Sequence, residues 1–261
     1  MTKIIIFYFI RRAKNNVLLF SALFFLTPFN GLSQQPYNKG GYWLTYLGDN
    51  KINDFLGIHS EIQLRSLGVS HTLSTKFFRA GINFYTSKSS MITAGYGFFY
   101  TEPTRENVFG SIVRENRVWQ QFLMRKKTNY VFMEHRYRLE QRFIENATLN
   151  TTLTDHRARY RFQAIVPFYN ISPYLRYFFF ATYNELMLNF RWNSADVYDR
   201  NRLYFALGVQ VSPKLNFQIG YLNQLATQNA APNLEVNHLF QVGVSYNMDD
   251  LMRSFFSPTK E

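Results

Sequence analysis

The chain has 261 residues, with 29 Lys plus Arg against 17 Asp plus Glu, and a formal net charge of +12. It contains no Cys, which excludes a disulfide scaffold, a thiolate zinc site and a Cys nucleophile. At 46 % hydrophobic residues it does not have the composition of a disordered chain, and its length suits one domain or one barrel.

Residues 1–33 have the order of an export signal. Lys3 and the basic residues at 11–14 supply positive charge, residues 17–29 form an apolar stretch, and Gly31-Leu-Ser33 is a small-x-small cleavage site. We therefore expect a cleaved signal peptide and a mature chain that begins at Gln34. The alternative is a membrane anchor over residues 4–26, which is disfavoured because basic residues interrupt its apolar run.

After residue 33 no apolar run is long enough for a helical membrane span, so a membrane-embedded form would have to be a closed β-barrel. The dominant hydrophobic period is two, which is typical of strands with one apolar and one polar face. The predicted strands cover residues 42–48, 55–66, 72–86, 91–100, 117–126, 130–143, 155–166, 174–190, 200–212, 215–225 and 236–247. Many of them reach ten residues, as membrane-barrel strands do.

The predicted fold is therefore all-β, an antiparallel transmembrane β-barrel with a polar, charged lumen, over residues 34–247. Residues 248–261 are predicted to form a C-terminal tail. A barrel whose two ends both lie in the periplasm needs an even strand number. We accordingly expect residues 42–48 to lie at a rim or in a plug, leaving ten strands, with twelve as the alternative.

Connections predicted to be short follow residues 86, 126, 166 and 211, and long ones cover 102–116, 144–154, 191–199 and 226–235. Short turns at one rim and long loops at the other are typical of outer-membrane barrels. The alternation slips near residues 181–184, which predicts a β-bulge there.

The strongest local feature is a ladder of charges on one face of two neighbouring predicted strands. An Arg facing lipid near the midplane costs about 2–4 kcal/mol, so these side chains are expected to face the lumen. Charged residues of other strands are expected to join them there. The complete predicted ladder is Glu61, Arg65, Glu134, Arg136, Arg138, Glu140, Arg142, Asp155, Arg157, Arg159, Arg161, Glu185 and Arg202.

The ladder is open to two interpretations. Ion pairs could fill and close a small barrel, which would make the ladder structural. Alternatively the arginines could form an anion-selective constriction or hold an anionic ligand. The excess of Arg over carboxylate on the two central strands does not by itself decide between them.

Patterns for catalysis, metals and nucleic acid are weak, and no catalytic residue, metal site or cofactor is predicted. The five His show no His-x-His or His-x-x-x-His spacing for a metal. No His-x-Ser pair occurs, although a barrel enzyme acting on lipid or lipid A at the rim remains an alternative function. A second alternative is a soluble periplasmic β-rich binding protein. Nucleic acid is not an expected partner of an exported chain.

Several motifs resemble those of a known family. They are Trp43-Leu-Thr-Tyr, Glu61-x-x-x-Arg65, Arg79-x-Gly81, Gly95-Tyr96, Trp119, His135-Arg-Tyr-Arg-Leu-Glu-Gln-Arg142, Arg157-x-Arg-Tyr-Arg161, Asn184-Glu185, Asn201-Arg202, Gly220-Tyr221-Leu-Asn-Gln224 and Asn237-His238. Together they resemble an uncharacterised family of Gram-negative outer-membrane barrels, the domain of unknown function numbered twenty-four ninety, over nearly all of residues 40–247. The resemblance implies the fold and an outer-membrane location, and it carries no activity.

The expected function is accordingly an outer-membrane barrel of unassigned activity that is not an enzyme. It would be either structural or a small anion-preferring channel. The expected partners are outer-membrane lipids, lipopolysaccharide and the barrel assembly machinery.

Overall fold

The computed structural model describes residues 37–67, 73–103, 112–128, 130–146, 150–168, 177–190, 197–227 and 234–247. The predicted signal peptide at 1–33 and the predicted tail at 248–261 lie outside the described residues. No helix among the described residues is long and apolar enough to cross a membrane.

The described residues form eleven β-strands, and each predicted strand corresponds to one of them. In chain order they are β1 (Tyr37–Lys51), β2 (Leu56–Leu67), β3 (Thr75–Ser87), β4 (Ser90–Thr101), β5 (Val113–Lys127), β6 (Phe132–Asn146), β7 (Thr151–Pro167), β8 (Phe178–Asn189), β9 (Tyr198–Gln210), β10 (Leu215–Thr227) and β11 (Leu234–Asn247).

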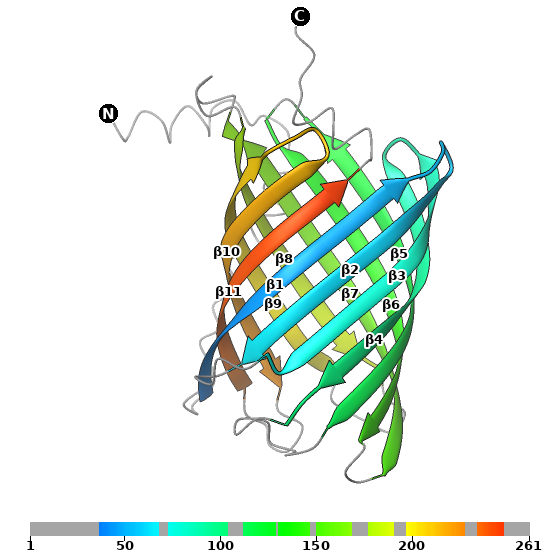
Figure 1. Cartoon of the computed structure of the whole chain (residues 1–261), viewed down its shortest axis with the longest axis vertical. Coiled ribbons are helices and arrows are strands. Elements are labelled where there is room, and N and C mark those ends of the chain that lie inside the picture. The colour runs from blue at the N-terminus through cyan, green and yellow to red at the C-terminus, as the bar shows by residue number, and fades with distance from the viewer. Residues whose placement is uncertain are drawn as a thin grey trace, which may run out of the picture. The chain divides into compact units, whose positions relative to one another are not determined.

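The strands close into one barrel in which every sequential neighbour pairs antiparallel and β1 pairs with β11. That closing pair is parallel, and it runs from Tyr37 opposite Glu235 to Asp49 opposite Asn247. Figure 1 shows the arrows of β1 and β11 side by side and pointing the same way.

The predicted count of ten strands, with twelve as the alternative, is therefore wrong, and so is the prediction that residues 42–48 lie in a rim or plug segment. An even count is required only when every neighbouring pair is antiparallel. One parallel pair closes an odd-numbered barrel, and it places Tyr37 and Asn247 at opposite rims.

We call the end of the barrel where β1 finishes the turn rim, and the opposite end the loop rim. The turn rim carries the connections 52–55, 88–89, 128–131, 168–177 and 211–214, and the loop rim carries 68–74, 102–112, 147–150, 190–197 and 228–233. The predicted alternation of short and long connections fails at β6–β7 and β7–β8, where the strand ends differ from the prediction. The pairing irregularity of β8 lies between Met187 and Leu188, not at the predicted residues 181–184.

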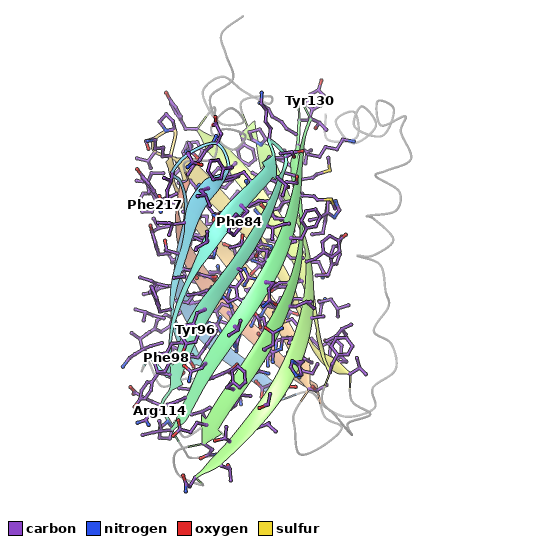
Figure 2. The ribbon with its side chains drawn as sticks, turned by 90° about the vertical axis from the view of Figure 1, so that its right-hand side faces the viewer. Phe84, Tyr96, Phe98, Arg114, Tyr130 and Phe217 are labelled. Atoms are coloured by element: carbon purple, nitrogen blue, oxygen red, sulfur yellow. The ribbon has the colours of Figure 1, made fainter. Side chains whose placement is uncertain are left out.

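Side chains alternate between the inside and the outside of the barrel along each strand, as the pleat requires. On β5, for example, Glu115, Arg117 and Gln121 are buried, whereas Val118 and Phe122 are exposed. The apolar face is thus outside and the charged face inside. In Figure 2 the labelled Phe84, Tyr96, Phe98 and Phe217 project away from the barrel, between Tyr130 near one end and Arg114 near the other.

Two small apolar clusters fill parts of the interior that charged side chains do not occupy. One joins Trp43, Tyr204, Ala206, Leu222 and Leu239 beside the β1–β11 pair. The other joins Phe132, Ile165, Phe179 and Ala181 near the turn rim.

Candidate functional site

The interior of the barrel holds a cavity of about 340 Å³. Side chains from all eleven strands line it, from Asn216 and Ser245 near the turn rim to Thr75 and Val113 near the loop rim. A barrel of this strand number leaves space in its interior that side chains only partly fill.

Arginine dominates the charge around this cavity. Among the described residues, the lining arginines are Arg65, Arg79, Arg117, Arg125, Arg136, Arg138, Arg142, Arg157, Arg159, Arg161, Arg200 and Arg202. The carboxylates buried with them are Asp49, Glu61, Glu115, Glu134, Glu140, Asp155, Glu185 and Asp199. Twelve guanidinium groups therefore face eight carboxylates, and the described interior keeps a positive excess.

Glu140 is the centre of one half of the network. Its Oε1 accepts hydrogen bonds from Arg159 Nη1 at 2.7 Å and Arg79 Nη2 at 3.2 Å, and its Oε2 accepts one from Arg117 Nη1 at 3.2 Å. Arg138 Nη1 lies 3.9 Å from the same carboxylate. Glu140 is 1 % exposed, so its charge depends on these arginines for stabilisation.

Glu185 is the centre of the other half. Arg159 Nη2 lies 2.8 Å from its Oε1 and 2.9 Å from its Oε2, Arg136 Nη2 donates to Oε1, and Arg202 Nη1 lies 3.5 Å from Oε2. Arg159 thus binds both central carboxylates. The register places Arg138 directly opposite Arg159, a like-charge pair that would be unfavourable without a shared counterion.

Two further carboxylates each bind two arginines. Glu134 accepts from Arg161 at 2.6 Å and from Arg125 at 3.1 Å. Glu115 accepts two hydrogen bonds from Arg142, at 2.6 and 3.1 Å, and two from Arg117. Arg142 also donates to Asp155 at 3.0 Å, and Arg157 pairs with Asp199 at 3.1 Å.

Trp119 packs against two arginines of the Glu140 half of the network. Its indole is fully buried, with the guanidinium carbons of Arg138 and Arg79 at 4.7 and 5.2 Å from its ring centroid. It lies against Gly95, where an added Cβ would come within 2.7 Å of the ring and 2.2 Å of the Ala80 carbonyl oxygen. Glycine on β4 therefore makes room for the aromatic ring on which the two arginines stack.

Three arginines are held by glutamine rather than by a close carboxylate. Gln63 Oε1 accepts from Arg65 at 2.9 and 2.5 Å, and Gln121 Oε1 accepts from Arg138 at 3.1 and 2.6 Å. Arg202 donates from Nε to the corresponding oxygen of Gln224 at 2.8 Å. A neutral amide oxygen orients a guanidinium but leaves its positive charge uncompensated.

The structure brings all thirteen residues of the predicted ladder to this interior. The sequence analysis missed five partners that complete the pairing: Arg79, Glu115, Arg117, Arg125 and Asp199. Alternation within β5 carried the signal for three of them. Glu115 was missed because residues 102–116 were predicted to be a loop, whereas β5 begins at Val113.

His59 lies in the interior of the barrel and is buried there. Its Nδ1 is 2.8 Å from Asp49 Oδ1, and its ring meets that of Trp119 edge-on at 5.3 Å. Asn83 donates to the same Asp49 oxygen at 2.9 Å. No cluster of three or more His, Asp or Glu that could hold a metal occurs among the described residues.

Buried guanidinium groups in excess over carboxylates can attract, orient and bind anions, because an anion replaces the missing counterion. The paired remainder of the network holds the strands' inner faces together. A family model described as "Protein of unknown function (DUF2490)" matches residues 40–235. No curated protein matches the chain.

Proposed function

Because the chain belongs to the DUF2490 family, whose description names no activity, we propose its function from its fold and interior. The proposal is an outer-membrane β-barrel that is not an enzyme and whose narrow, arginine-rich interior prefers small anions. The apolar outer surface supports the membrane location, and the excess of arginine supports the anion preference.

The observation that carries the membrane location is the inside-out distribution of polarity. Large apolar side chains are exposed on every strand, with exposed fractions of 56 % at Leu139 and 57 % at Leu207, while the charges of the predicted ladder lie in the interior. A soluble monomer seldom exposes a continuous apolar surface of this extent. Members of this belt include Leu44, Ile62, Ile82, Ile92, Phe122, Leu139, Phe178, Leu207, Ile219 and Phe240.

The outer surface also indicates which part of the barrel would meet lipid. Exterior polar side chains pair with each other between the middle of the strands and the loop rim, as Gln120 with Gln141 at 3.2 and 3.3 Å and Asn184 with Asn201 at 3.1 and 3.2 Å. Paired amides of this kind tolerate an interfacial environment better than single ones. We place the hydrocarbon core over the turn-rim part of the strands, with the loop rim projecting from the membrane.

The predicted export signal at residues 1–33 would direct the chain across the inner membrane, which an outer-membrane location requires. The exposed Lys88 and Lys126 and the partly buried Lys214 lie at or beside the turn rim, where lipid phosphates would meet them. Outer-membrane lipids, lipopolysaccharide and the barrel assembly machinery remain the proposed partners.

Membrane fractionation with N-terminal sequencing and single-Cys labelling tests the location, and the chain's lack of Cys makes labelling unambiguous. Lipid-phase maleimides should react at positions 139, 205, 207 and 242 in the outer-membrane fraction, and not at 138, 159 or 206. A protein recovered from the soluble periplasm would instead favour a β-rich binding protein.

Planar-bilayer recording tests the anion preference. A small conductance with a reversal potential on the anion side supports the proposal, because twelve arginines face eight carboxylates around the cavity. A folded, inserted barrel with no conductance would favour a structural protein whose ion pairs close the interior. Release of fatty acid from lipid, or alteration of lipid A, by the purified barrel would favour the enzyme.

A further inference from the structure

Trp43 is the meeting point of two arginines that come from distant parts of the chain. The guanidinium carbon of Arg65 lies 4.2 Å from the indole centroid, and that of Arg202 lies 4.8 Å from it. Arg65 reaches the ring from the directly opposed position on β2, and Arg202 reaches it from β9. The indole is 3 % exposed, so these contacts are made in the interior.

Both arginines are oriented without being neutralised at close range. Gln63 accepts two hydrogen bonds from Arg65, and Gln224 accepts one from Arg202. Arg65 has no carboxylate oxygen within ion-pair distance among the described residues, and Arg202 has only Glu185, at 3.5 Å. The two guanidinium groups lie over the same indole, so like charges approach each other there. Two cations therefore share one region in which Glu185, 3.5 Å from Arg202, is the only carboxylate within ion-pair distance of either among the described residues.

Two buried donors beside these arginines also lack a hydrogen-bond partner. Trp43 Nε1 and Tyr204 Oη are both enclosed and unsatisfied, and the two residues pack in the same cluster with Leu222 and Leu239. Leaving a buried donor unpaired costs about 1–3 kcal/mol, a cost that a bound acceptor would remove. Positive charge and unsatisfied donors in one place define a site for a group that carries negative charge and accepts hydrogen bonds.

We infer that Trp43, Arg65, Arg202 and Tyr204 form a binding site for a small oxyanion, a carboxylate or a phosphate. This site deepens the proposed anion preference, and its wider relevance rests on that proposal. The cavity of about 340 Å³ limits the ligand to a small molecule or ion. The stacked rings of Tyr183 and Tyr204 both line the cavity and give the site an apolar wall, which favours a carboxylate that carries a short hydrocarbon or aromatic group.

Calorimetric titration of the purified, folded barrel in detergent tests the site, with sodium benzoate and inorganic phosphate as probes against sodium chloride at equal ionic strength. Benzoate binding is expected, with phosphate weaker. Arg65→Gln and Arg202→Gln should each weaken benzoate binding roughly tenfold or more, because each removes a charged donor. Lys214→Gln makes the same charge change outside the cavity and should leave the affinity unchanged.

Fluorescence supplies a second readout that does not depend on an arginine variant folding. The chain has three Trp, and benzoate should change the emission of the wild type but not that of Trp43→Phe. Phosphate binding with no benzoate binding would assign the site to inorganic anions. The inference is overturned if neither probe binds, or if both arginine variants fold and bind like the wild type.

The failure of this inference and the failure of the proposed function give different results. Binding that is lost in the arginine variants, together with a silent planar bilayer, would support the site and reject the channel. A conductance that is unchanged in the same variants, with no probe binding, would support the channel and reject the site.

Discussion

Arg159 Nη1 donates to Glu140 Oε1 at 2.7 Å, and this contact joins the two halves of the interior network. The register places Glu140 opposite Arg157, so the contact is a diagonal one across β6 and β7. Through Nε and Nη2 of the same guanidinium, at 3.2 and 2.8 Å, Arg159 also binds Glu185 Oε1 on β8. One side chain therefore connects carboxylates from two different strands.

Removing the Glu140 carboxylate should strongly destabilise the barrel. Glu140→Gln would leave Arg79, Arg117 and Arg159 without a shared buried counterion, and breaking a buried ion pair of this kind costs about 3–5 kcal/mol. The heat-modifiable band on a gel should convert to the unfolded form at a lower temperature, and urea should unfold the variant at a lower concentration.

Glu145→Gln is the matched control for Glu140→Gln. Glu145 pairs with Arg114 at 3.8 Å, and both side chains are 49 % exposed, so the change should cost under about 1 kcal/mol. Equal transition temperatures for the two variants would show that the interior ion pairs do not hold the barrel together, and would favour freely hydrated arginines.

A methyl group at position 95 should displace the indole ring of Trp119, on which Arg79 and Arg138 stack. In Gly95→Ala the new Cβ would approach the Ala80 carbonyl oxygen to 2.2 Å and the Trp119 ring to 2.7 Å, so β3, β4 and the indole would have to move. We expect lower stability and altered near-ultraviolet circular dichroism. Gly40→Ala has no atom within 4 Å of its new Cβ and should be neutral.

The parallel β1–β11 pair, which we call the seam, predicts a specific cross-link. Leu44 on β1 is the register partner of Val242 on β11, and both lie on the outer face. The double variant Leu44→Cys with Val242→Cys should therefore be joined by a short thiol cross-linker in the folded barrel. A barrel of ten strands that excludes β1 would not form this cross-link. Leu44→Cys with Ile219→Cys, which lies one strand further on, should stay unlinked.

The same parallel pairing predicts that the first residue of β1 and the last residue of β11 lie on opposite sides of a membrane. Because β1 and β11 run in the same direction, Tyr37 starts at the loop rim and Asn247 ends at the turn rim. An epitope inserted before Tyr37 in the mature chain should be accessible to antibody on intact cells, whereas one placed after Asn247 should require permeabilised cells. Both epitopes on the same side would contradict the parallel closure in the membrane.

The sequence by itself determined the strands and the faces on which their side chains lie. Alternation is a local property of the pleat, so Arg138 and Leu139 must lie on opposite faces whatever the rest of the chain does. The high cost of placing arginine in lipid then assigned the charged face to the interior. These two arguments were enough to bring all thirteen ladder residues to one place, and the motifs pointed to the correct family.

Tertiary structure alone decided how the barrel closes and which charges pair. The β1–β11 contact joins residues about two hundred positions apart, and no local pattern states whether such strands meet parallel or antiparallel. The pairing of Arg159 with Glu140 and Glu185 depends on the stagger of three strands and on side-chain length. The Trp43 site likewise needs closure of the ring, because Arg65 and Arg202 reach the indole from β2 and β9, on either side of the seam.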